Sequence, residues 1–165
     1  MEKNYEMNII IVDYKLCNVG SIRSILKKVG YDALISDKMN DVKKADVLIL
    51  PGVGAFDKGM EQLKKMDLIG PLNQKVLEEK TPVLGICLGM QLMTKKSEEG
   101  ILEGLGWFDA ETKRFNFKEK QLLIPHMGWN TICLKKQDNL TKEFSETMRF
   151  YFVHSYYVKA NQDKS

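Results

Sequence analysis

The chain has 165 residues, of which 44% are hydrophobic and 28% charged, and its formal net charge at pH 7 is +3. These values are ordinary for one globular domain with a sizeable core, and the small, dispersed charge does not indicate a nucleic-acid partner. The three cysteines lack the spacing of a disulfide-rich protein, which suits a reducing compartment. The early apolar run at residues 9–12 is too short for a signal peptide or a membrane-spanning helix. We therefore expect a cytoplasmic protein with no membrane or nucleic-acid partner.

The first half of the chain alternates strand-like and helix-like segments. Apolar runs predict strands at residues 8–13, 31–36, 46–50 and 83–86. Helices are predicted at residues 21–30, 41–45 and 71–80, and a further helix carries Phe56, Met60 and Leu63 on one face. The first of these helices is expected to begin at the cap Ser21 and to present a single apolar face made of Ile22, Ile25, Leu26 and Val29.

This alternation predicts an α/β fold, with a parallel sheet flanked by helices. Ligands bind beyond the carboxyl ends of the strands in such sheets. Asp13, Pro51 and Cys87 each follow a predicted strand, so three loops are expected to meet on one rim. From about residue 104 the segments look like strands without intervening helices, at 104–117, 122–134 and 150–158. They predict an antiparallel extension in the C-terminal third of one domain that spans residues 1–165.

Cys87 stands at the centre of Gly85-Ile-Cys-Leu-Gly89, between a strand and a segment that can be helical. This pattern is typical of a nucleophile elbow, a sharp strand-to-helix turn that projects one side chain into a cleft. A helix N-terminus favours the thiolate, and the Leu88 amide is placed to face a developing oxyanion. The alternative is an inert, buried cysteine at a strand end, and Cys133 is interpreted in that way.

Pro51-Gly-Val-Gly54 follows another predicted strand and is the second candidate for an oxyanion hole, with the Val53 amide as donor. No Cys-x-x-Cys pair occurs, and His126 and His154 lie far apart in sequence. Neither a metal ion nor a cofactor is therefore predicted, and both histidines are interpreted as structural.

Together these residues resemble the class I glutamine amidotransferases and, within them, the glutaminase subunits of imidazole glycerol phosphate synthase. Many amidotransferases share the elbow, whereas Pro-His-Met-Gly-Trp-Asn and Phe-Val-His-Ser-Tyr narrow the resemblance. The matching pieces occur in family order over nearly the whole chain: Val12-Asp-Tyr14 with Asn18, Leu50–Phe56, Gly85–Gln91, Ser97–Gly100, Pro125–Asn130 and Tyr151–Tyr156.

The resemblance implies hydrolysis of glutamine to glutamate and ammonia, with Cys87 as nucleophile and the Val53 and Leu88 amides as oxyanion donors. It implies that glutamine is held by Gly52, Gly54, Gln91, Glu99, Ser155 and Tyr156. It also implies a heterodimer in which ammonia passes to a barrel-shaped cyclase that makes imidazole glycerol phosphate and AICAR in histidine biosynthesis. The residues implied at that interface are Asn18, Pro125, Met127, Trp129 and Asn130.

The sequence departs from the family pattern in its catalytic base. These amidotransferases carry a His-Pro-Glu motif near the C-terminus, whose histidine is the base and whose glutamate orients it, and this sequence contains no His-Pro-Glu. The explanations are a C-terminally truncated chain, a base from another chain, or a non-hydrolytic relative. Truncation is favoured because the other pieces of the glutamine site are intact, and we predict little or no glutaminase activity for the 165-residue chain itself.

The first loop is a second departure, because Lys15 and Cys17 stand where the family usually has glycines. The runner-up function is therefore that of a paralogous subunit, which supplies ammonia for an amidated surface sugar. Two hypotheses from other classes are a cysteine hydrolase on a similar elbow and a catalytically incomplete docking subunit. Labelling of Cys87 by a glutamine-like alkylator separates an amidotransferase from both.

Overall fold

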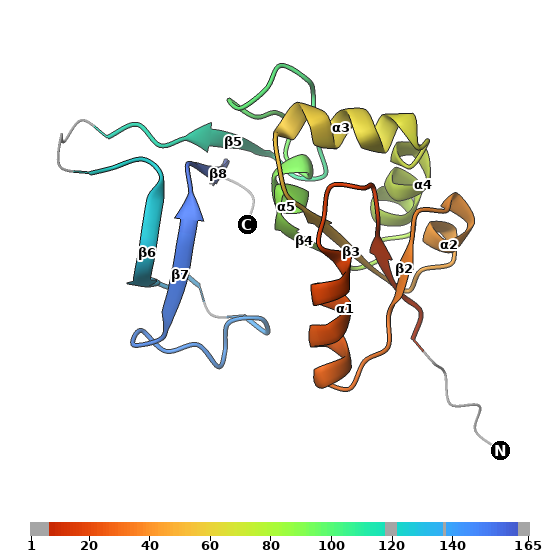
Figure 1. The fold of residues 1–165 in the computed structure, drawn as a ribbon, viewed down its shortest axis with the longest axis horizontal. Coiled ribbons are helices and arrows are strands. Elements are labelled where there is room, and N and C mark those ends of the chain that lie inside the picture. Colours follow the sequence, from red (N-terminus) through yellow and green to blue (C-terminus); the bar gives the residue numbers. More distant parts are fainter. Residues whose placement is uncertain (1–6, 118–121, 137, 162–165) are drawn as a thin grey trace. The chain divides into compact units, whose positions relative to one another are not determined.

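The computed structural model describes residues 7–117, 122–136 and 138–161, which divide into two compact units (Figure 1). The first unit comprises the chain up to Lys113 together with the part from Val158 onward, and the second unit is Arg114–Tyr157. Among the described residues, no helix is long and apolar enough to cross a membrane.

A four-stranded parallel sheet forms the centre of the first unit. Its strands lie in the order β2-β1-β3-β4, and each neighbouring pair is parallel. The bounds are Ile9–Val12 for β1, Leu34–Ser36 for β2, Val47–Gly52 for β3 and Val83–Cys87 for β4. The predicted α/β fold is confirmed. The predicted rim is confirmed too, because β1, β3 and β4 are neighbours whose carboxyl ends lie at the same edge.

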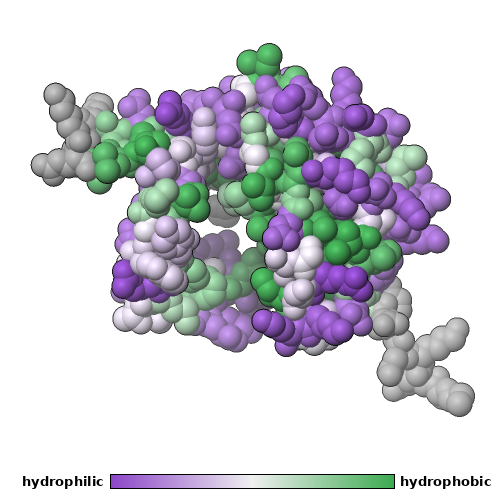
Figure 2. Space-filling view, in the orientation of Figure 1, coloured by the Kyte–Doolittle hydropathy of each residue, from purple (hydrophilic) through white to green (hydrophobic). Residues whose placement is uncertain are grey.

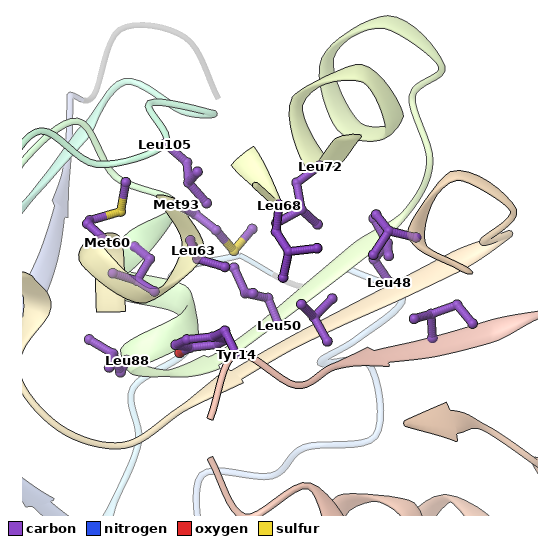
Figure 3. Close-up of a cluster of buried hydrophobic side chains, with 14 of the residues drawn as sticks. Tyr14, Leu48, Leu50, Met60, Leu63, Leu68, Leu72, Leu88, Met93 and Leu105 are labelled. Atoms are coloured by element: carbon purple, nitrogen blue, oxygen red, sulfur yellow. The ribbon is translucent and has the colours of Figure 1, made fainter. Parts of the chain in front are cut away.

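Helices cover both faces of this sheet (Figure 1). Their bounds are Val19–Lys28 for α1, Met39–Lys43 for α2, Phe56–Lys65 for α3, Ile69–Asn73 for α4 and Leu88–Leu92 for α5. Successive strand residues point to opposite faces, so Ile10 and Val12 join a cluster with α2 to α5, whereas Ile9 and Ile11 pack with α1. Figure 3 shows the larger cluster, in which Tyr14 lies among leucines.

Helix α1 differs from the prediction in its start and in the face that it buries. The Asn18 side chain caps it by accepting a hydrogen bond from the Ser21 amide at 3.3 Å, so the predicted cap Ser21 lies inside the first turn. Leu26 packs on the sheet, but Ile25 and Val29 are 61% and 63% exposed. The predicted apolar face is thus only partly covered, since α1 lies over β1 and the three-residue edge strand β2. Apolar residues accordingly interrupt the largely hydrophilic surface of this unit (Figure 2).

Two prolines lie inside elements rather than at their ends. Strand β3 continues through Pro51, where the sequence predicted a break, and Pro51 pairs with Ile86 of β4. The pairing of β3 with β1 ends earlier, at Ile49. Because Pro51 therefore has no β1 residue opposite it, its missing N–H costs no hydrogen bond between these two strands. Pro71 was predicted to open a helix, but α4 begins two residues before it and continues as a π-helical turn, η1, over Gln74–Glu78.

The strands after residue 104 are shorter than predicted and form two pairs. Strands β6 (His126–Thr131) and β7 (Arg149–His154) form an antiparallel pair in the second unit, which confirms the antiparallel pairing there. Strands β5 (Ala110–Arg114) and β8 (Tyr156–Ala160) form a second pair, so the predicted strand at 150–158 is two strands separated at Ser155. Cys133 is exposed, and its predicted place in a core was wrong because a two-stranded sheet leaves its neighbourhood open.

Candidate active site

Strand β4 ends and α5 begins at Cys87, which adopts a φ of +54° and a ψ of −116°. A positive φ is uncommon for a residue with a side chain, and this conformation turns the chain sharply from strand to helix. The thiol-bearing residue is exposed. The predicted elbow geometry is confirmed, and the alternative of an inert, buried cysteine does not fit.

The elbow is held against the end of β3 through Gly89. A Cβ atom on Gly89 would lie 1.7 Å from the carbonyl oxygen of Leu50, so no other residue fits while α5 keeps this position. This contact gives a physical reason for the glycine two residues after Cys87. The elbow and the Pro51–Gly54 segment are thus joined, and Gly52 is the strand partner of Cys87 itself.

The two predicted oxyanion donors differ in their availability. Leu88 is the first residue of α5, where backbone N–H groups have no acceptor within the helix. The amide of Val53 instead donates a hydrogen bond to the carbonyl oxygen of Leu16 at 2.6 Å. Gly54 follows with a φ of +119°. In this structure, therefore, the Val53 amide serves the loop after β1, and a role at an oxyanion requires that this bond break.

Two further predicted glutamine ligands in the first unit are Gln91, on α5, and Glu99, which contacts the start of α3. Gln91 lies one helical turn after Cys87, and its Oε1 is buried without a hydrogen-bond partner among the described residues. The Glu99 carboxylate accepts a hydrogen bond from the Phe56 amide at 3.1 Å and so caps the start of α3. Helix α3 directly follows the Pro51–Gly54 segment, which links Glu99 to that segment.

Asp57 completes this link from the other side and was missed by the sequence reasoning. Its carboxylate accepts hydrogen bonds from the Ile101 amide at 3.1 and 3.0 Å and from the Leu102 amide at 3.0 Å. Glu99 and Asp57 therefore cap each other's segments reciprocally. An acidic residue in the first turn of a predicted helix was the available signal, but its partners lie more than 40 residues away in sequence.

Apart from Asn18, which caps α1 in the first unit, the remaining predicted site residues belong to the second unit. The Ser155 carbonyl accepts a hydrogen bond from the Phe115 amide, and the Tyr156 carbonyl accepts one from His154 Nδ1. Their place beside Cys87 stays a prediction. On one face of β6 and β7 four apolar side chains are more than half exposed, and they are Met127, Trp129, Tyr151 and Val153.

The two histidines form a connected chain of hydrogen bonds on the other face of this pair. Because a carbonyl oxygen only accepts, His154 donates from Nδ1 to Tyr156, and His154 Nε2 shares a hydrogen bond with His126 Nδ1, 3.0 Å away. The Asn130 amide completes the chain at His126 Nε2, at 3.5 Å. Both rings also contact aromatic side chains. This satisfied network supports the interpretation of both histidines as structural.

Two side chains in the loop after β1, Tyr14 and Cys17, have raised pKa values. Burial raises the pKa of the Tyr14 hydroxyl far above its ordinary value, and the nearby Cys17 and Cys87 raise it further. Burial also raises the pKa of the Cys17 thiol, as does the neighbouring Asp13 carboxylate. Over the residues that the structure describes, no group of three or more His, Cys, Asp or Glu side chains is arranged to hold a metal ion.

The model of the family "Glutamine amidotransferase class-I" matches residues 10–165. The chain is 51% identical over 157 residues to the imidazole glycerol phosphate synthase subunit HisH 2 of Methanococcus maripaludis, an alignment that covers 95% of this chain and 77% of that protein. It is 43% identical over 150 residues to HisH 2 of Pseudomonas aeruginosa, covering 91% and 74%. The chain is a class I glutamine amidotransferase of the HisH group.

Solved structures agree with this amidotransferase fold. The chain superposes with a TM-score of 0.64 on a protein from Thermoplasma acidophilum that is described as part of a GMP synthase, with 16% identity, covering 94% of this chain and 68% of that one. A crystal structure of a glutamine amidotransferase gives a TM-score of 0.55 with 20% identity, covering 68% and 59%. At these identities the likeness concerns the fold alone.

Proposed function

We propose that this amidotransferase is a glutaminase subunit that hydrolyses glutamine to glutamate and ammonia. The ammonia passes to a cyclase subunit that forms imidazole glycerol phosphate and AICAR in histidine biosynthesis. The single observation that carries the chemistry is Cys87, exposed on a strained elbow beside the Pro51–Gly54 segment. The identity to HisH subunits supports the pathway. The proposal includes one amidotransferase domain over residues 1–165, a cytoplasmic location and no cofactor.

In the proposed mechanism the Cys87 thiolate attacks the side-chain amide carbon of glutamine. The carbon–sulfur bond forms, the carbonyl oxygen gains negative charge, and the Leu88 and Val53 amides stabilise it. The carbon–nitrogen bond then breaks as the nitrogen takes up the proton released from the Cys87 thiol, and ammonia leaves. Water hydrolyses the thioester to glutamate and regenerates the Cys87 thiol. Gly52, Gly54, Gln91, Glu99, Ser155 and Tyr156 are proposed to hold the substrate.

We propose the second unit as the docking surface for the cyclase, which would be barrel-shaped. Trp129 stands opposite Tyr151 across β6 and β7, with ring centroids 5.7 Å apart, and both are more than half exposed. Large aromatic side chains on an open face are typical of interface hot spots. Pro125, Met127 and Asn130 of the second unit and Asn18 of the first unit complete the proposed interface.

A second candidate function is ammonia supply to a related synthase that makes an amidated surface sugar. The Lys15 and Cys17 departures in the first loop favour it, and the relatives named HisH 1 and HisH 2 carry numbers that distinguish copies of this subunit. The glutamine chemistry would be the same, and only the acceptor of the ammonia would differ.

The test of the glutaminase site is labelling with a chloromethyl ketone analogue of glutamine, read by peptide mass spectrometry. We expect labelling of Cys87 and protection of Cys87 by glutamine. Cys133 is the internal control, because it is also exposed and free but has no glutamine site. Iodoacetamide should label both cysteines. Equal labelling of Cys87 and Cys133 by the analogue would refute a glutamine site and favour the docking subunit.

A further inference from the structure

Tyr14, in the loop after β1, is the largest fully buried side chain of the first unit. Its hydroxyl is also buried, and it has no hydrogen-bond partner among the described residues. Leaving a buried hydroxyl unpaired is unfavourable, whereas phenylalanine would fill the same space without that cost. The hydroxyl is therefore a donor that this state of the molecule does not use.

The position of this hydroxyl is specific. A Cβ atom on Gly52 would lie 2.0 Å from the Tyr14 hydroxyl oxygen and 2.9 Å from the Leu88 Cβ. Figure 3 shows the hydroxyl end of Tyr14 directed toward Leu88. The donor thus lies against the backbone of Gly52, between the two segments that carry the proposed oxyanion amides of Val53 and Leu88.

The same loop also holds the Val53 amide, through the Leu16 carbonyl oxygen. A trans peptide carries its N–H and its C=O on opposite sides. Turning the Val53 N–H away from Leu16 and toward Cys87 therefore turns the Gly52 carbonyl oxygen toward the loop after β1. The Tyr14 hydroxyl, which lies against Gly52, is a donor available to a carbonyl oxygen turned in this way.

We propose that Tyr14 is a positioning residue for the oxyanion hole: its hydroxyl donates a hydrogen bond to the Gly52 carbonyl oxygen in the reacting form and so holds the Val53 amide toward the substrate. This inference rests on the proposed glutaminase function. The raised pKa of Tyr14 agrees with it, since burial and the adjacent thiols keep the hydroxyl protonated and able to donate.

The test is Tyr14→Phe, which removes only the hydroxyl and preserves the packing. Two reagents separate the roles of Cys87. Thiolate addition to the ketone carbon of the analogue forms an oxyanion, and chloride then leaves as the sulfur bonds to the adjacent carbon. Iodoacetamide instead alkylates the thiolate by direct displacement of iodide, without an oxyanion. We expect the maximal rate of analogue labelling to fall about tenfold, part of what one oxyanion donor contributes. The half-saturating analogue concentration and the iodoacetamide rate should stay unchanged.

Stability supplies the second readout. Because the hydroxyl has no partner in the resting structure, we expect the urea midpoint of Tyr14→Phe to equal or exceed that of the unmodified chain. Tyr31→Phe, at an exposed tyrosine outside the elbow, is the matched control and should change neither readout.

Four outcomes would overturn the inference. Unchanged analogue labelling would show that the hydroxyl does not act on the oxyanion hole. A lower urea midpoint would show an ordinary structural tyrosine, as would an equal loss with both reagents. If the unmodified chain reacts with iodoacetamide at Cys87 but not with the analogue, the proposed function itself fails, and the role of Tyr14 fails with it.

Discussion

Among the described glycines, Gly89 is the one at which an added Cβ atom would come closest to another atom. Its added Cβ would meet the backbone carbonyl of Leu50, so the clash is relieved only if α5 moves away from β3. We expect Gly89→Ala to lower the free energy of unfolding by about 2–3 kcal/mol and to abolish analogue labelling of Cys87. Urea denaturation and mass spectrometry measure the two effects.

The control for this variant is Gly20→Ala, because a Cβ on Gly20 would meet only the Asn18 Oδ1, at 4.0 Å. Gly20 lies in helix α1, where alanine is the better helix former, so the stability should be unchanged or slightly higher. Wild-type stability of Gly89→Ala would contradict the close approach of α5 to β3.

At the scale of elements, hydrogen bonds of the Asp57 and Glu99 carboxylates join α3 to the loop at residues 99–102. We expect Asp57→Ala to lower the free energy of unfolding by about 1–3 kcal/mol, since it leaves backbone amides of that loop without their acceptor. Because Glu99 is then held less firmly, the half-saturating concentration of the glutamine analogue should rise several-fold. The maximal labelling rate should stay near that of the unmodified chain.

Glu61→Ala is the matched control on the same helix, since Glu61 is an exposed carboxylate paired with Lys58. Its effect on stability should stay within about 0.5 kcal/mol, and analogue binding should be unaffected. A fall in the maximal rate of Asp57→Ala without a change in half-saturation would argue that Asp57 acts on the chemistry and not through Glu99.

At the scale of the whole molecule, the 165 residues contain the proposed nucleophile Cys87 and none of the family's His-Pro-Glu motif. His126 and His154 are engaged with each other. We expect the 165-residue chain to be labelled at Cys87 yet to release ammonia from glutamine at a rate near background, measured by coupled ammonia detection. Robust turnover that Cys87→Ala abolishes would contradict this expectation and show that another group serves as the base.

The parallel sheet, its rim and the elbow were predictable because their signals are local. Apolar runs give strands, and short strand–helix alternation gives parallel pairing. Glycines two residues on either side of Cys87 indicate the turn. Helix ends and exposed faces were less predictable. Asn18 and Ser21 are both good caps by type, and whether Ile25 is buried depends on how wide the sheet beneath it is.

The sequence by itself determined the order of the strands along the chain and the elbow at Cys87, and it predicted the nucleophile and the glutamine site from the family pattern. Only the tertiary structure decided how the site's polar groups are used. In the structure the Val53 amide donates a hydrogen bond to Leu16, and the Tyr14 hydroxyl next to Gly52 has no partner among the described residues. The Asp57 carboxylate accepts hydrogen bonds from the loop that carries Glu99. The physical reason is that a hydrogen bond requires two atoms within about 3 Å in a fixed orientation. When the partners lie tens of residues apart, their meeting depends on packing that no local pattern records.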